Sequence, residues 1–200
     1  MSENKYTYVF NSDYIIEKYQ LANLLCAFGD IGYQTGSLVV PIDAVRFLSH
    51  FLDNTGSDYT MNVNSLLSTS INAVNYYNEH MSYIIEYAKD IVKDGQTITI
   101  ATNCRYTAHD KKLAIIDMNW TGALGSCSGA IVAKVTRNNN RYKITYKYYI
   151  YDYYDWNEML DAGFVLSNLW DSDLAKLHRA GIAREFYVIG NIENKMEILY

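Results

Sequence analysis

Apolar residues recur every three to four positions through the first half of the chain, which is the spacing of amphipathic helices. Ser12 can cap the first helix and Gly29 can end it, so the stretch from Gly29 to Val40, which contains three glycines, is expected to be a loop. The polar stretch Ser68 to Ser70 can interrupt the last helical region. The predicted helices are Ser12 to Phe28, Pro41 to Leu52 and Asn64 to Lys93.

After Gly95 the pattern changes from the helical period to the alternation typical of strands. Asn138 to Asn140 is a strong turn signal, because asparagine tolerates positive φ better than most residues, and it joins two alternating segments into one long antiparallel hairpin. Asp171 or Ser172 can cap a short helix that Gly181 ends. The predicted strands are Thr97 to Thr102, Trp120 to Leu124, Gly129 to Arg137, Arg141 to Tyr154 and Ala183 to Ile189, while Lys111 to Ile116 is ambiguous.

These patterns predict an α+β fold in a single domain, residues 1–200. Residues 1–95 are mainly helical and are expected to pack on one face of a mostly antiparallel sheet built around the long hairpin. Residues 96–200 mainly form strands, with a short helix near 172–180. Because half of the 200 residues are hydrophobic, the chain can bury a sizeable core.

Charge and composition argue against several classes of protein. The formal net charge is −5, whereas nucleic-acid-binding proteins normally carry a basic field, so no nucleic-acid partner is expected. No stretch approaches the roughly 18 uninterrupted apolar residues of a membrane span, and the N-terminal residues lack a signal-peptide pattern. Cys26, Cys104 and Cys127 are too widely spaced for a zinc or disulfide framework and are expected to be free, buried thiols.

The segment Arg141 to Tyr154 is the clearest strand, and it contains 7 of the 20 tyrosines. Alternation places Asp152 on its more apolar face, where a carboxylate needs a partner, a metal ion or water. Asp155 follows where the strand ends, and the two carboxylates can hold a hard cation or act as an acid/base pair. Alternatively, both are solvated and cap a turn. Glu158 and Asp161 lie within reach of the following loop.

The short helix near 172–180 carries a second candidate pair, His178 and Arg179. A neutral histidine near carboxylates can act as a general base or a metal ligand, and an adjacent arginine can hold a phosphate. Alternatively, both cations are there because the helix dipole favours positive charge in a last turn. The functional cleft is expected where the strand end at Asp152 meets this helix.

Two blocks of sequence resemble the C-terminal modules of bacterial polymorphic toxins and bacteriocin-like proteins, and the resemblance extends from about Asp117 to Gly190. They are Tyr151-Asp152-Tyr153-Tyr154-Asp155-Trp156 and the later helix with His178 and Arg179. The Asp-x-Tyr-Asp set with His-Arg is similar to the catalytic motif of the colicin M family. In that family the spacer before His-Arg is short, whereas more than twenty residues intervene here.

The resemblance implies an antibacterial toxin-type hydrolase that cleaves the lipid-linked peptidoglycan precursor lipid II with the help of a divalent cation, Mg²⁺ or Ca²⁺. The implied catalytic residues are Asp152, Tyr154, Asp155, His178 and Arg179, with Asp152 and Asp155 holding the metal. It also implies an immunity protein as a partner and export by a dedicated secretion system to a target-cell envelope. The alternative is a non-catalytic binding module of bacterial or phage origin, in which the Asp, His and Arg side chains are structural.

Overall fold

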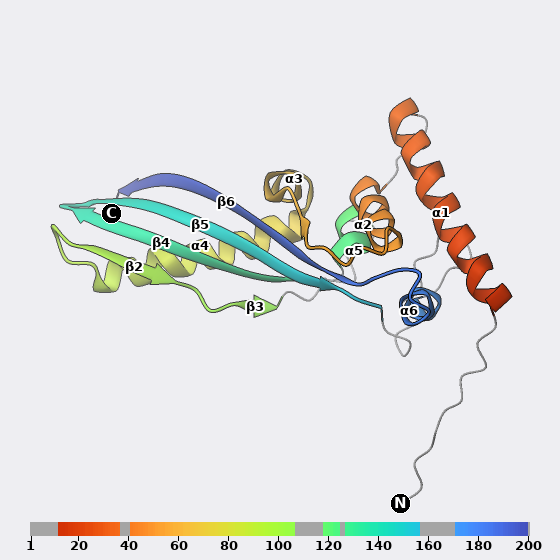
Figure 1. Cartoon of the computed structure of the whole chain (residues 1–200). Coiled ribbons are helices and arrows are strands. Elements are labelled where there is room, and N and C mark those ends of the chain that lie inside the picture. Colours follow the sequence, from red (N-terminus) through yellow and green to blue (C-terminus); the bar gives the residue numbers. More distant parts are fainter. Residues whose placement is uncertain (1–11, 37–40, 107–117, 125–126, 157–170, 200) are drawn as a thin grey trace, which may run out of the picture.

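The computed structural model describes residues 12–36, 41–106, 118–124, 127–156 and 171–199 (Figure 1). Its helices are α1 (Ser12–Thr35), α2 (Ile42–Leu52), α3 (Val63–Thr69), α4 (Ile71–Ile91), α5 (Met118–Leu124) and α6 (Asp171–Arg179). Its strands are β1 (Tyr59–Thr60), β2 (Thr97–Ala101), β3 (Arg105–Tyr106), β4 (Ser128–Asn138), β5 (Arg141–Tyr154) and β6 (Phe186–Leu199).

The strands form one sheet in the order β1-β6-β5-β4-β2, and β3 pairs with the start of β4. All pairs are antiparallel except the short pairing of β1 with β6. The sheet and the helices confirm the predicted α+β class. Ser70 separates α3 from α4 by capping the second helix through its side chain, as the polar interruption in the sequence indicated.

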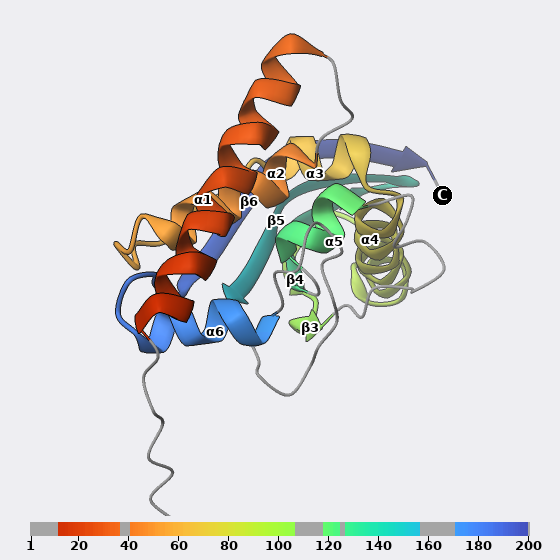
Figure 2. The same ribbon diagram turned by 90° about the vertical axis from the view of Figure 1, so that its right-hand side faces the viewer.

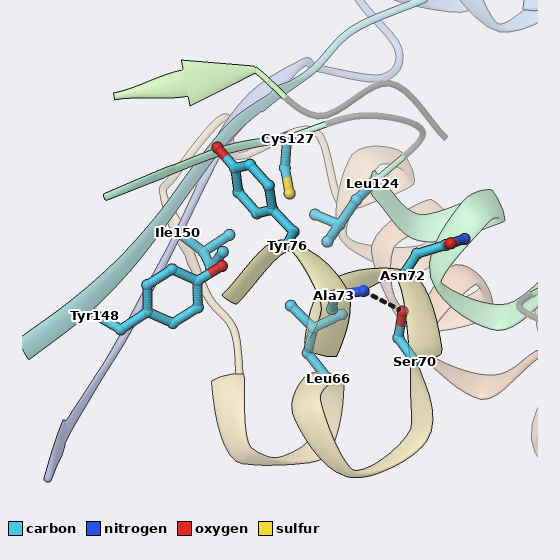
Figure 3. Close-up of a pocket in the computed structure, with 9 residues that line it drawn as sticks. All are labelled: Leu66, Ser70, Asn72, Ala73, Tyr76, Leu124, Cys127, Tyr148 and Ile150. Atoms are coloured by element: carbon cyan, nitrogen blue, oxygen red, sulfur yellow. Dashed lines mark hydrogen bonds between the residues drawn. The ribbon is translucent and has the colours of Figure 1, made fainter. Parts of the chain in front are cut away.

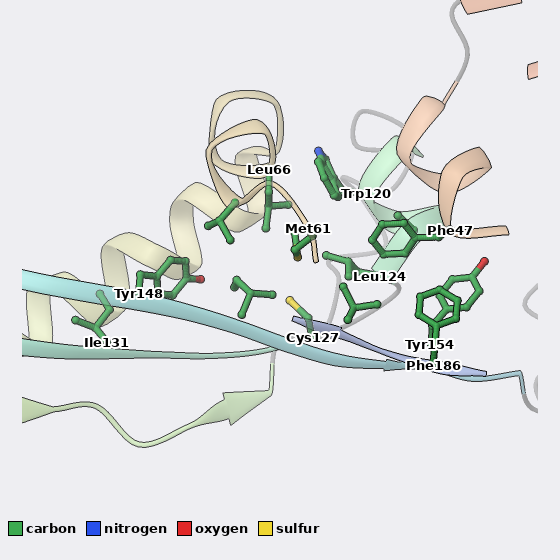
Figure 4. Close-up of a cluster of buried hydrophobic side chains, with 14 of the residues drawn as sticks. Phe47, Met61, Leu66, Trp120, Leu124, Cys127, Ile131, Tyr148, Tyr154 and Phe186 are labelled. Carbon is green, nitrogen blue, oxygen red and sulfur yellow. The ribbon is translucent and has the colours of Figure 1, made fainter. Parts of the chain in front are cut away.

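The β4–β5 hairpin is the centre of the sheet. Its register pairs Asn138 with Arg141, and Asn139 adopts a left-handed φ of 54°, which confirms the predicted asparagine turn. Along β5, burial alternates as expected, so Tyr142, Tyr148 and the other residues of that face are covered while their neighbours are exposed. Figure 4 shows how this face and the helices share one core, with Tyr148 beneath α4 and Tyr154 beside Phe47 and Phe186.

The helices lie on the inner face of the sheet and beyond one of its ends. Helix α4 runs along β4 and β2, and Tyr77 forms a hydrogen bond with Tyr146 of β5 (2.5 Å between hydroxyl oxygens). Helices α1, α2, α5 and α6 gather where β5 ends and β6 begins, with α1 packed against both α2 and α6 (Figures 1 and 2). The end of β5 that carries Asp152 therefore lies next to this helical cluster.

The segment Trp120 to Leu124 belongs to helix α5, so the predicted strand was wrong. Trp120, Ala123 and Leu124 are all buried, and their spacing of three and four positions places them on one side of a helix. The Trp120 indole donates a hydrogen bond to the Thr69 hydroxyl at the end of α3 (2.8 Å). A short apolar run fits either a strand or a helix, and here contacts with distant elements decide between them.

Two predicted boundaries at glycines were also wrong. Helix α1 continues past Gly29 to Thr35 and ends before Gly36, whose φ is 62°. Strand β6 begins at Phe186, later than the predicted Ala183, and continues past Ile189 and Gly190 to Leu199. Gly29 and Gly190 each allow a neighbour to pack closely. A Cβ at Gly29 would lie 2.7 Å from Val45 Cγ2, and one at Gly190 would lie 2.5 Å from Met61 Cγ.

We expect Gly29→Ala to destabilise the protein, although alanine is the better helix former. The added methyl would overlap with the stiff, β-branched Val45, and such overpacking costs about 1–3 kcal/mol, against about 1 kcal/mol gained in helix propensity. Urea denaturation measures the net change. In a Val45→Ala background the overlap is gone, and Gly29→Ala should then be neutral or stabilising. A similar loss in both backgrounds would contradict this explanation.

Candidate functional site

Asp152 occupies the position that alternation predicted, on the inner face of β5 between the buried residues Ile150 and Tyr154. Its backbone pairs with Val188 of β6. Burial raises the pKa of the Asp152 carboxyl to about 8, against the lowering effect of a hydrogen bond with the Tyr153 backbone, and the charge of Asp155 raises it further. At neutral pH this carboxyl is therefore mostly protonated and is poised to exchange a proton.

Asp155 lies one residue beyond the end of β5 and is exposed. The structure brings it close enough to Asp152 for its charge to affect the Asp152 pKa. The predicted pair of carboxylates is therefore a feature of the fold, with one member sheltered and the other in solvent. Glu158 and Asp161, the two further carboxylates noted in the sequence, lie outside the described residues.

Tyr154 belongs to an aromatic cluster in the core and is 6% exposed. Its ring stacks on Phe186 (4.9 Å between centroids) and meets Trp156 edge-on (5.1 Å). Burial raises the pKa of the Tyr154 phenol well above its usual value, and Cys26, Asp171 and Asp152 raise it further. The phenol thus stays neutral. Its electrostatic coupling to Asp171 shows that α6 begins beside the end of β5.

His178 is held by Glu185, a residue that the sequence patterns did not single out. The Glu185 backbone N–H donates to Nδ1 of His178 (3.3 Å), and Nε2 lies 3.6 Å from the Glu185 carboxylate. Because Nδ1 accepts a hydrogen bond, the neutral ring carries its proton on Nε2, facing the carboxylate. His178 therefore has no lone pair available for a water molecule while it keeps this arrangement. Arg179, the next residue, is exposed.

Glu185 also ties α6 to the end of β5. Its carboxylate accepts hydrogen bonds from the Tyr153 hydroxyl and from the Trp156 backbone N–H, each at 3.3 Å. Tyr153 and Glu185 lie on the outer side of the strand end, whereas Asp152 points inward. The structure thus brings His178 to the predicted end of β5, next to the outward neighbours of Asp152. No sequence pattern would have identified Glu185, because its position beside Tyr153 depends on the β5–β6 register.

Asp173 anchors α6 to α1 and is 1% exposed. Its carboxylate lies 3.4 Å from Lys18 of α1 and 3.5 Å from Lys176 of its own helix, and it accepts a hydrogen bond from the Tyr14 hydroxyl. Burial raises the pKa of Tyr14 to about 12, with the hydrogen bond and the charge of Asp173 as further causes. This network fixes the helix that carries His178 and Arg179.

Two cavities lie on the helix side of the sheet and neither includes the Asp152 carboxyl. The first is about 20 Å³, lies beneath α3 and α4, and contains the buried Tyr148 hydroxyl, which has no hydrogen-bond partner among the described residues (Figure 3). The second is about 100 Å³ and is lined by His80, Thr102 and three neighbouring polar residues.

Cys127 lines the first cavity and is buried like Cys26, whereas Cys104 is exposed, contrary to the expectation for this thiol.

Within the described ranges, no group of three or more His, Cys, Asp or Glu side chains is arranged to hold a metal ion. The same part of the chain contains no helix long and apolar enough to cross a membrane.

Comparison with known proteins gives structural similarity only. No family model and no curated protein matches the chain. It is similar to PaeM, a colicin M-like bacteriocin produced by Pseudomonas aeruginosa (TM-score 0.46, 11% identity, 80% of this chain and 52% of that one). It is also similar to truncated bacteriocin syringacin M from Pseudomonas syringae pv. tomato DC3000 (0.44, 12%, 79% and 60%) and to pectocin M2 (0.35, 15%, 80% and 50%). The chain thus spans only about half the length of these structures.

Proposed function

We propose that this protein is an antibacterial toxin-type hydrolase that cleaves the phosphoester linkage of lipid II. The observation that carries the proposal is the carboxylate pair at the end of β5, where burial raises the pKa of Asp152 to about 8 beside the exposed Asp155. Strongly perturbed carboxyls of this kind are concentrated at functional sites. The pair also coincides with the Asp-x-Tyr-Asp block that resembles the colicin M motif.

The two carboxylates are a suitable donor set for Mg²⁺, which proteins commonly hold through one or two carboxylates while substrate phosphates supply further oxygen ligands. Among the described residues, no cation lies close enough to the sheltered Asp152 carboxyl to lower its pKa, and a divalent ion would supply that charge. When bound, the ion would offset the repulsion between an acidic protein and a pyrophosphate substrate. Asp152 and Asp155 are the residues that would hold it.

The reaction is hydrolysis. A water oxygen forms a new bond to phosphorus, the bond from phosphorus to the prenyl oxygen breaks, and the leaving oxygen takes up a proton. Asp152 carries no proton while it holds the cation, so that proton comes from solvent or from His178. Arg179 is exposed and can stabilise the charge of a bound phosphate, and His178 can activate water if it leaves Glu185. Tyr154 can orient a phosphate only if the aromatic cluster opens, because its ring is buried.

The direct test is to incubate the protein with detergent-solubilised lipid II and Mg²⁺ or Ca²⁺ and to measure the undecaprenol released. We expect release by the wild type, and a loss of about 10²–10⁴-fold in Asp155→Ala, the size typical of a removed acid/base group. Asp58→Ala, which removes another exposed carboxylate, is the matched control and should retain activity. Chelation of divalent cations should stop the reaction. Absence of product with the wild type, or equal rates in both variants, would rule the proposal out.

A binding module is the second candidate, and the Glu185 contacts favour it, because they give His178 a structural partner at both ring nitrogens. In that case His178→Ala costs about 1 kcal/mol of stability, since the pair is partly exposed, and there is no turnover to lose. Expression in bacteria separates the candidates further. Toxicity restricted to protein directed to the periplasm supports an envelope substrate, whereas harmless expression in both compartments supports the binding module.

A further inference from the structure

The outer face of the sheet, formed by the β4, β5 and β6 side chains that point away from the helices, is divided into an aromatic end and a basic end. The aromatic end lies beside Asp155, where β5 finishes and β6 begins (Figure 1). The basic end lies towards the β4–β5 turn. The two named cavities are on the opposite, helix side, so neither opens onto this face.

We call the aromatic end the tyrosine patch, which consists of Tyr149, Tyr151, Tyr153, Tyr187 and Ile189. These side chains are 39% to 47% exposed, although all are large and largely apolar. Tyr187 packs between its cross-strand neighbours, with ring centroids 5.6 Å from Tyr151 and 4.8 Å from Tyr153. A contiguous patch of this kind on a sheet face marks an interaction surface.

The basic end presents five cations, Lys134, Arg141, Lys143, Lys147 and Lys195, against two carboxylates, Glu193 and Glu197. Lys134 and Lys195 flank Thr145 in one row across three strands, so no carboxylate lies directly opposite either of them. Lys147 joins the two ends, because its ammonium lies 5.3 Å from the Tyr149 ring centroid. The basic end is therefore net positive on a chain whose formal net charge is −5, whereas the carboxylates Asp58, Asp155 and Glu185 lie beside the tyrosine patch.

We propose that the outer face docks the protein on the surface of an anionic lipid bilayer. Tyrosine suits the membrane–water interface, since its ring is apolar and its hydroxyl remains hydrated. Lysines near an anionic membrane each add to binding, and their long side chains can adjust to the headgroups. The net positive charge of the basic end would offset the repulsion between the acidic remainder of the chain and such a surface.

The pattern favours a bilayer over a protein partner. This face combines exposed tyrosines with five cations, the two kinds of group that an anionic membrane surface attracts. Its aromatic and basic groups extend along the sheet, as contact with a plane requires. The docking does not depend on the proposed hydrolysis, although it would bring the β5 end with Asp155 close to the membrane surface.

Co-sedimentation with vesicles that lack lipid II tests this proposal separately from the hydrolase. One set of vesicles contains equimolar phosphatidylglycerol and phosphatidylethanolamine, and the other contains phosphatidylcholine alone. We expect the wild type to bind the anionic vesicles, to bind the neutral ones weakly, and to be released by salt. Tyr151→Ser/Tyr187→Ser and Lys134→Glu/Lys195→Glu should each lower the partition coefficient at least about tenfold.

Matched controls come from the helix side. Tyr83 and Tyr87 on α4 form an exposed stacked pair (5.8 Å between centroids), so Tyr83→Ser/Tyr87→Ser removes the same groups from another surface. Lys89→Glu/Lys93→Glu makes the same change in net charge. Both should bind like the wild type.

Three results would overturn the proposal. The first is no binding by the wild type, and the second is an equal loss of binding in the control variants. The third is a wild-type dimer in analytical ultracentrifugation that Tyr151→Ser/Tyr187→Ser dissociates, which would assign the patch to a second copy of the chain. Because lipid II hydrolysis is assayed in detergent, failure of docking and failure of the hydrolase are distinguishable.

Discussion

Replacing Asp173 with alanine is expected to lower the free energy of unfolding by about 3–5 kcal/mol, the usual cost of removing one partner from a buried ion pair. The Asp173 side chain is 2% exposed and the Lys18 side chain facing it is 12% exposed. Without the carboxylate, the Lys18 ammonium and the Tyr14 hydroxyl would lose the anion that they share between α1 and α6. Urea denaturation, followed by circular dichroism, measures the change.

Lys176→Ala is the matched control for this network. Lys176 faces the same carboxylate at 3.5 Å, but its side chain is 38% exposed, so its removal should cost less than about 1 kcal/mol. Asp173→Asn should fall between the two, since the amide can still accept from Tyr14 but cannot neutralise Lys18. A loss of less than 1 kcal/mol in Asp173→Ala would contradict a buried ionic anchor between α6 and α1.

Asp152→Asn is expected to change how stability depends on pH. The native carboxyl has a pKa of about 8, whereas its ordinary value is 3.8, so between these pH values the folded chain retains a proton that the unfolded chain releases. Wild-type stability therefore falls as pH rises through this window, and the contribution of protonated Asp152 is lost above pH 8. Asparagine has no such proton to lose. Asp152→Asn should match the wild type near pH 4 and exceed it by up to about 6 kcal/mol near pH 9, the value of a shift of about four pKa units.

Thermal denaturation across this pH range measures the difference. Asp155→Asn provides an internal control: since the charge of Asp155 raises the Asp152 pKa, its removal should move the loss of stability to lower pH. Excess Mg²⁺ at pH 8 should stabilise the wild type more than Asp152→Asn if the two carboxylates hold a cation. Parallel stability curves for wild type and Asp152→Asn would show that Asp152 is not sheltered.

The sequence predicted what depends on neighbours along the chain. Alternation placed Asp152 on the covered face of β5, and Asn139 marked the hairpin turn. One group of failures came from glycines, which can serve more than one purpose: Gly36 ends α1, whereas Gly29 makes room for Val45. The local sequence does not distinguish a glycine that ends a helix from one that makes room for a neighbour. The role of Gly29 depends on Val45, which lies in the next helix of the chain.

The candidate site shows the same contrast between features set by the local sequence and features set by tertiary contacts. The Asp152 and Asp155 pair comes from one strand end and was predictable, as was the short helix with His178 and Arg179. The groups that hold this helix were not: Asp173 meets Lys18 from the far end of the chain, and Glu185 meets Tyr153 only through the β5–β6 register. Such pairs require the tertiary arrangement, and sequence spacing carries no trace of them.

The pairing of β1 with β6 has a consequence for solubility. Strand β1 pairs only with Val188 and Ile189, so among the described residues the remainder of β6 has a strand partner on one side only. An unpaired strand edge can recruit a strand from another molecule and start aggregation. Along this stretch β6 carries Glu193, Lys195 and Glu197 at alternate positions, and charges spaced in this way oppose the stacking of a foreign strand. These charges allow β6 to keep an unpaired edge without promoting aggregation.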